Sequence, residues 1–463
     1  MQLKLFLAVV LISLSFITHG QDTISYNTAT GTSIKFGVGG FIRAGFYTWT
    51  GKSDKKLYIP TAFSDFGIKA DAGNKNFRAF ADMRIRYGAE FGNPVTRFDF
   101  REAYVNVNGR KWDVTAGQKI IKWGRADFTN PTSKLSPQNF ISRSPDREDM
   151  DLGNLLAALN WHPSPVLNLG AVLVPYYRSS TLIIDPIPLP ANVEISQINS
   201  LLSDTKMFGY GLKADLHLQG FDWSLSWFDG YDPMPGIALT KFNLDLSQPV
   251  PVPSIGLSVT PYKTRMLGTD FETTAGAFGI RGEAAWTMPA LSFRNYEYVP
   301  MSEIRWVAGT DRASGIWRFI VEYSGKYITD FTPSTTGSLI GTEPDYAQLA
   351  EIMALPGFDP ENYAREQVGA FNRLYNYQLD RVSHSAGFRA EAELAYGRVI
   401  PSVFALYNIT TRDLMTIPEI KVKPADGITV SVGAELYQGR QGSLYNLVKD
   451  FMNGVYFSIR ADF

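Results

Sequence analysis

Apolar and mostly polar side chains alternate without interruption over the last ten residues of the chain, Gly454 to Phe463. Successive side chains of an extended strand point to opposite faces, so this pattern predicts a strand with one apolar and one polar face. The residues expected to face lipid are Val455, Phe457, Ile459, Ala461 and Phe463, and those expected to face a wet interior are Tyr456, Ser458, Arg460 and Asp462. A strand of a soluble β-sandwich rarely ends a chain on its apolar face. The ending is therefore typical of a transmembrane β-barrel.

The same period, combined with turn residues, predicts about eighteen strands, with sixteen as the alternative. The expected ranges are 33–49, 62–72, 77–91, 98–108, 112–121, 150–162, 166–177, 207–219, 221–229, 260–274, 277–288, 301–310, 315–329, 382–395, 398–411, 414–424, 427–437 and 453–463. Every second connection is tight, as at Gly220 and Gly276, and the intervening ones are mostly long. Tight periplasmic turns and long extracellular loops indicate an all-β fold, a closed antiparallel barrel of even strand number.

Residues 77 to 91 show which face is polar, because an apolar stripe that includes Met83 and Ile85 alternates there with charges. Arginine or lysine at lipid mid-depth costs about 2–4 kcal/mol, so the charges must face the lumen. The predicted lumen-facing wall comprises Arg78, Asp82, Arg84, Arg86, Glu90, Asp99, Arg101, Arg281, Glu283, Arg318, Glu322, Arg389 and Glu391. Arg101 and Glu102 are adjacent, and a β-bulge would let both face inward. These charges either brace the wall or line an aqueous channel, which barrels of this width contain.

The long connection 122–149 is polar and rich in both signs of charge, with Trp123, Phe128 and Phe140 as apolar anchors. Such a loop could fold into the barrel and narrow the pore, its charges acting as a selectivity filter. The alternative is a solvated outer loop. The candidate constriction residues are Lys122, Arg125, Asp127, Arg143, Asp146, Arg147 and Asp149.

Three further long loops carry apolar or helical sequence. Loops 178–206 and 229–261 are rich in proline and apolar residues, which favours packing on each other, a hydrophobic ligand, or contact with a partner protein or lipopolysaccharide. Loop 330–381 contains two N-cap patterns with an early proline, and predicts a helical insertion with helices at 347–355 and 362–379. The apolar set Tyr363, Ala370, Phe371, Leu374 and Tyr375 is spaced for one helical face, more typical of packing than of a ligand site.

The first twenty residues have a basic residue, Lys4, and a short apolar stretch that ends near Gly20, as in a cleavable secretion signal. Residues 21–463 are then expected to form one barrel domain.

The chain has no cysteine, which excludes disulfides and thiolate metal sites, and its net charge of −1 argues against a nucleic-acid partner. Beyond the predicted signal the chain has three scattered histidines, His162, His217 and His384. They show neither metal-ligand spacing nor a serine partner, so we expect no metal, no cofactor and no enzymatic activity.

The segment Gln118 to Asp127, which contains the Trp123-Gly124 dipeptide, is followed by Asn130-Pro131 and Pro145-Asp146. With Leu267–Phe271, Gly282–Trp286 and the last strand, it resembles a poorly characterised family of Gram-negative outer-membrane porin-like proteins, distantly similar to alginate-export-type barrels. In that family a Trp-Gly dipeptide ends a strand and opens a long polar loop. The resemblance covers much of the barrel but not loops 178–206 and 330–381, and it implies a channel or transporter, in some members for hydrophobic or anionic solutes.

Together these observations predict a porin-like channel in the cell outer membrane for passive diffusion of small polar or charged solutes. Its expected partners are outer-membrane lipid and the solutes themselves, and the sequence leaves open whether the barrel forms a homo-oligomer. A structural or adhesive barrel and a transporter of a hydrophobic ligand are the alternatives. The first strand begins soon after the predicted signal, which leaves no room for the plug domain of an energised receptor.

Overall fold

The computed structural model describes residues 24–27, 33–50, 56–183, 186–187, 192–196, 207–245, 252–334 and 356–463. Its main feature is a closed antiparallel barrel of eighteen strands, as the alternation predicts. The barrel strands are β2 (Ser33–Thr50), β3 (Leu57–Gly73), β4 (Phe77–Glu90), β5 (Asn93–Asn108), β6 (Trp112–Lys119), β7 (Asn154–Ser164), β8 (Leu167–Val174), β10 (Gly209–Leu218), β11 (Phe221–Tyr231), β14 (Lys263–Ala275), β15 (Phe278–Pro289), β16 (Glu303–Ser314), β17 (Trp317–Ile328), β18 (Val382–Ala392), β19 (Val399–Asn408), β20 (Asp413–Ala425), β21 (Ile428–Gln438) and β22 (Gly454–Asp462). Pairing of β2 with β22 closes the ring.

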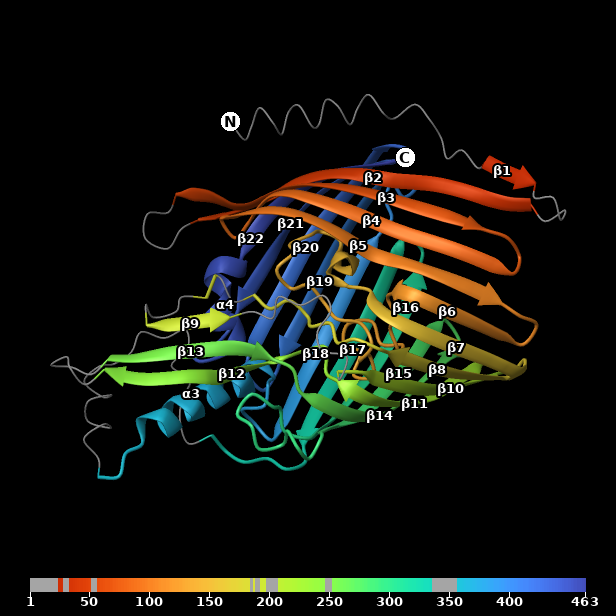
Figure 1. Cartoon of the computed structure of the whole chain (residues 1–463). Coiled ribbons are helices and arrows are strands. Elements are labelled where there is room, and N and C mark those ends of the chain that lie inside the picture. Colours follow the sequence, from red (N-terminus) through yellow and green to blue (C-terminus); the bar gives the residue numbers. More distant parts are fainter. Residues whose placement is uncertain are drawn as a thin grey trace.

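The two ends of the barrel differ, as Figure 1 shows. Tight turns gather at one end, and the long connections with their own strands and helices gather at the other. A short additional strand, β1 (Ile24–Asn27), pairs with β2 near its beginning. The predicted secretion signal, residues 1–20, lies outside the described residues.

Side chains sort onto two faces of the wall in the predicted phase. In β4, Ile85 and Tyr87 are 44% and 55% exposed, whereas the alternating Asp82 and Arg86 are 1% and 5% exposed. The bulge predicted at Arg101 is also present: Asp82 pairs with Glu102 and the next residue, Met83, pairs with Phe100, so Arg101 has no partner on β4. The skipped residue keeps both adjacent charges on the inner face.

The two apolar loops pack on each other, one of the alternatives left open by the sequence. Loop 229–261 forms a hairpin of β12 (Gly236–Asp245) and β13 (Val252–Thr260), and β13 pairs in parallel with β9 (Val193–Ser196) from loop 178–206. The sequence pattern indicates irregular loops in both ranges and does not predict these strands. Prolines obscure the alternation there, and the short β9 is supported only by its distant partner.

One helix of the predicted insertion is present as α3 (Pro360–Tyr375). The Asp359 side chain caps it by accepting hydrogen bonds from the backbone N–H groups of Glu361 and Asn362. Its buried face, which includes Val368 and Phe371, packs on β12 and β13. The helix expected at 347–355 lies outside the described residues.

A second helix, α4 (Leu444–Met452), follows β21 and begins at the N-cap Ser443. This helix was not predicted from the sequence, since helices were expected in loop 330–381 alone. A 3₁₀-helix spans Arg147–Met150. No helix among the described residues has both the length and the apolar character that a membrane crossing requires.

Candidate functional site

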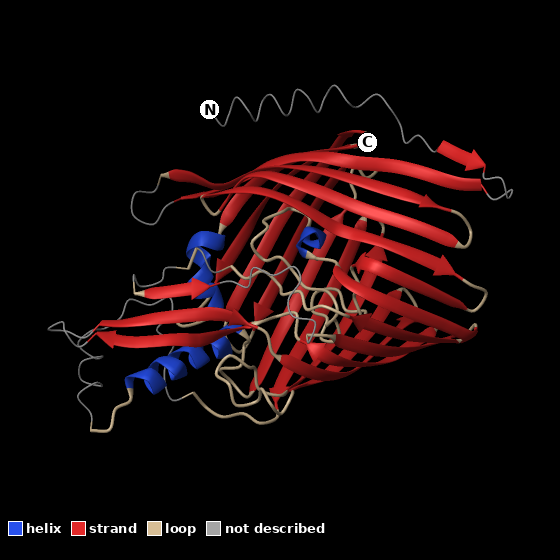
Figure 2. Cartoon of the chain, viewed as in Figure 1, coloured by secondary structure: helices blue, strands red, loops and turns tan. Residues whose placement is uncertain are grey.

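The connection between β6 and β7 turns into the barrel, where Figure 2 shows loop segments enclosed by the ring of strands. Its apolar residues Trp123 and Leu135 are 6% and 1% exposed, and they pack on an inward apolar patch of the wall that includes Leu156 and Met266. Trp123 lies against the backbone of Gly211, where a Cβ atom would come within 2.5 Å of the indole ring. Burial of these side chains explains why the loop leaves solvent and enters the lumen.

Two wall glutamates hold the tip of this loop by its backbone. Glu322 of β17 accepts hydrogen bonds from the N–H groups of Asp127, Phe128 and Thr129 at 2.9, 3.0 and 3.1 Å. Glu283 of β15 accepts from the N–H and hydroxyl groups of Thr132 at 2.7 and 2.8 Å. Both carboxylates are at most 4% exposed. Buried carboxylates need donors, and the loop backbone supplies them.

Charged side chains of the loop tip contact the same sector of the wall. Arg125 Nε donates to Asp270 Oδ1 at 2.7 Å, and its Nη1 lies 3.3 Å from Glu272 and 3.5 Å from Asp222. Although burial opposes ionisation, the hydrogen bond with Asp270 raises the pKa of Arg125. Asp127 lies 2.9 Å from Arg281, and burial raises the pKa of this aspartate.

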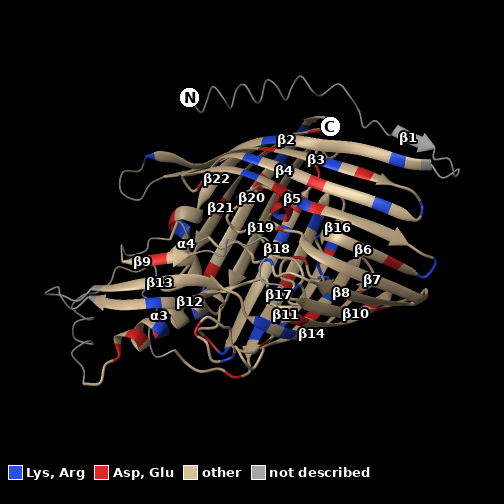
Figure 3. Ribbon diagram, in the orientation of Figure 1, with Lys and Arg blue, Asp and Glu red and all other residues tan. Residues whose placement is uncertain are grey.

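The second half of the loop contacts the opposite, arginine-rich sector. Asp149 lies 2.6 Å from Arg43 and 2.5 Å from Arg84. Burial opposes ionisation of Asp149, but these two arginines hold its pKa well below the usual range. Asp146 contacts Arg43 at 3.1 Å and Arg460 at 3.4 Å. Both signs of charge occur along β2 to β5, which form much of this sector (Figure 3).

The other three constriction candidates, Arg143, Arg147 and Lys122, make different contacts from those described above. Arg143 is 3% exposed, donates to Glu435 at 2.8 Å and stacks over the ring of Tyr47. Arg147 lies over the ring of Phe404. Lys122 pairs with Asp151 at the base of the loop, which places it away from the contacts across the lumen.

Most residues of the predicted wall are engaged in charge pairs. Arg86 bridges Asp65 and Glu90, Arg84 contacts Asp82, and Arg101 donates to the backbone carbonyl of Glu148 in the loop. At other places Arg78 pairs with Asp71, Asp99 with Arg97, Arg281 with Asp311, and Glu391 with both Arg318 and Arg389. The wall charges therefore form a network of ion pairs, and the charged residues of the loop join this network.

Several residues that organise the site were missed. Arg43 is 2% exposed and pairs with Asp65 of β3 at 2.6 Å, and the acceptor of Arg125, Asp270, is 1% exposed. The sequence gives a weak indication that Arg43 faces inward, because Arg43 lies on the same face of the strand as Phe41 and Tyr47. Glycines and aromatic residues around it made that strand look uniformly apolar.

Comparisons with known proteins address the fold. No family model matches the chain, and no curated protein matches it by sequence. Among solved structures, OccK9 (OpdG) of Pseudomonas aeruginosa is similar with a TM-score of 0.51 and 6% identity, covering 92% of this chain and 97% of its own. OccAB1 of Acinetobacter baumannii gives 0.50 and 10% identity, with 92% and 95% covered. The chain has the fold of outer-membrane channels. At these identities the likeness concerns the fold alone.

Proposed function

We propose that this protein is a porin-like channel of the outer membrane, and that the inserted loop 122–149 is its constriction. Small polar or charged solutes would diffuse past the loop without an energy source. The observation that carries the proposal is that one loop contacts opposite sectors of the lumen wall, through Glu322 on one side and Arg43 on the other.

The electrostatics of the constriction support selection by charge and orientation. The loop places Asp146 and Asp149 on the arginine-rich sector, and places Arg125 with several backbone N–H groups on the glutamate-rich sector. Acidic and basic groups on facing walls produce a field across the pore, which favours polar solutes that can orient in it. Lys122 would contribute least, because it lies at the loop base.

Recording from single barrels in a planar bilayer tests the channel directly. A discrete ohmic current from the purified, refolded protein supports the proposal, and a barrel that conducts no ions contradicts it. The absence of native cysteine allows single cysteines to be introduced and modified with a charged thiol reagent. Modification at Asp127→Cys should reduce the current, whereas modification at the outward-facing Tyr87→Cys should leave it unchanged.

The alternatives receive less support. In loop 229–261, Leu239, Leu257 and Val259 are buried in one cluster with α3, which leaves these side chains unavailable to a hydrophobic ligand. The three described histidines lie on β7, β10 and β18 and contact an aspartate, an aspartate and a tyrosine. We therefore favour a channel over an enzyme. The similarity to alginate-export-type barrels stays a sequence prediction.

A further inference from the structure

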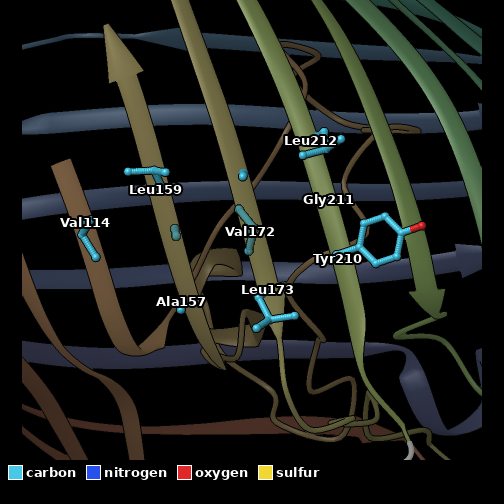
Figure 4. Close-up of a pocket in the computed structure, with 10 residues that line it drawn as sticks. Val114, Ala157, Leu159, Val172, Leu173, Tyr210, Gly211 and Leu212 are labelled. Carbon is cyan, nitrogen blue, oxygen red and sulfur yellow. The ribbon is translucent and has the colours of Figure 1, made fainter. Parts of the chain in front are cut away.

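The outward face of β6, β7, β8 and β10 is hollowed by an apolar groove of about 310 Å³ (Figure 4). Its lining residues are Val114, Ala157, Ala158, Leu159, Ala171, Val172, Leu173, Tyr210, Gly211 and Leu212. The groove is on the lipid side, since Leu159, Leu173 and Leu212 are 45%, 49% and 51% exposed. Alanines at 157 and 171 leave space that larger side chains would fill. An apolar hollow in this position needs an apolar occupant.

Charged residues lie beside this groove on the same face. Tyr210 at its rim pairs with Asp229 of β11, and Asp229 pairs with Arg265 of β14. Residues paired across a sheet share a face, so Asp229 and Arg265 also point outward, as does Lys263 two residues before Arg265. Lys263 and Arg265 contact the two oxygens of Asp229 at 2.7 and 2.8 Å. Among the described residues these two cations share one carboxylate, so this part of the cluster carries one net positive charge.

The position along the strands places this cluster at the level of lipid headgroups. Lys263 is the first residue of β14, and Asp229 is two residues from the end of β11, both at the end with long loops. Outward charges are strongly destabilising at the bilayer midplane but cost little near the interface. Lys263 lies over the ring of Phe208, which is 49% exposed. Exposed aromatic residues beside cations are typical of a membrane interface.

We propose that this face binds one lipopolysaccharide molecule, with a lipid A phosphate on Lys263 and Arg265 and an acyl chain in the groove. The proposal rests on the outer-membrane location given above. Phosphate complements this net positive charge, and the groove accepts only hydrocarbon. Arg265 lies two strands from Tyr210, roughly 10 Å at the spacing of paired strands. One lipid with several acyl chains and phosphates spans that distance, and the long-loop end of the barrel faces the leaflet that contains it.

Native mass spectrometry of the full-length protein in detergent, titrated with lipid A, tests the proposal. The variant Lys263→Gln/Arg265→Gln should bind lipid A about thirtyfold more weakly, since each cation near a membrane surface contributes about a factor of five. Ala171→Leu, which fills the groove, should also weaken binding. Arg312→Gln is the matched control, because Arg312 faces outward over Phe278 beside the turn after β16, at the other end of the barrel.

Equal affinity of the double variant and the Arg312→Gln control would overturn the proposal. Equal sensitivity of phosphatidylglycerol binding to the double variant would overturn the assignment to lipopolysaccharide. Heat-modifiable migration in dodecyl sulfate verifies that each variant is folded. The conductance of the double variant should match the wild type, because its residues face away from the pore. A wild-type protein that binds lipid A but conducts nothing would contradict the channel and leave the lipid site standing.

Discussion

Replacing Glu322 by glutamine should loosen the tip of the inserted loop. Its Oε2 atom accepts from Asp127 and Phe128, and its Oε1 atom accepts from Thr129. A glutamine amide has only one acceptor oxygen. In the more favourable orientation of this side chain, that oxygen keeps the two hydrogen bonds from Asp127 and Phe128, and the NH₂ group points towards the N–H of Thr129. Hydrogen bonds to a charged group contribute about 1.5–3 kcal/mol each, and an opposed donor adds nothing back. We expect attachment of the tip to weaken by about 2–3 kcal/mol.

At about 1.4 kcal/mol per factor of ten, this change raises the population of detached tips about 30- to 140-fold. Single-channel recordings should then show frequent transitions between two conductance levels, where the wild type shows one. Glu391→Gln is the matched control, because it also removes one negative charge from the lumen wall but contacts Arg318 and Arg389 instead of the loop. If Glu322→Gln and Glu391→Gln give the same current trace, the loop tip does not border the permeation path and the reasoning is refuted.

Three further outcomes are expected. Arg125→Gln and Arg143→Gln should each shift the reversal potential in a salt gradient towards cation selectivity, and unchanged potentials in both variants would remove these residues from the filter. The pKa of Asp149 is lowered in the folded state, so its contribution to stability is present above about pH 3.9 and is lost as the pH falls further. The difference in Tm between wild type and Asp149→Asn should accordingly stay constant from pH 7 to pH 5 and shrink below pH 4; a difference that shrinks already between pH 7 and pH 5 would contradict the lowered pKa. Phe371→Ala should cost about 3–5 kcal/mol in the packing of α3 and make loop 330–381 sensitive to protease while the barrel stays heat-modifiable; unchanged protease resistance would argue against that packing.

The alternation of apolar and polar side chains was by itself sufficient to predict the barrel. Each strand must hide its charges from lipid, and this requirement acts on every second residue, so it can be read within one strand without knowledge of its neighbours. The same local logic located the bulge at Arg101, where two adjacent charges could not otherwise share a face. The cap of α3 at Asp359 was readable for a similar reason, since capping involves residues within a single turn.

Only the tertiary structure decided where the inserted loop is held and by what. The acceptors of its tip, Glu283 and Glu322, are more than 150 residues away in sequence. The salt bridge between Asp149 and Arg43 likewise joins distant segments. Pairing of β9 with β13 depends in the same way on two loops that meet only after the ring has closed. Closure of the barrel brings these groups together, and contacts made by closure leave no periodic trace in the sequence around either partner.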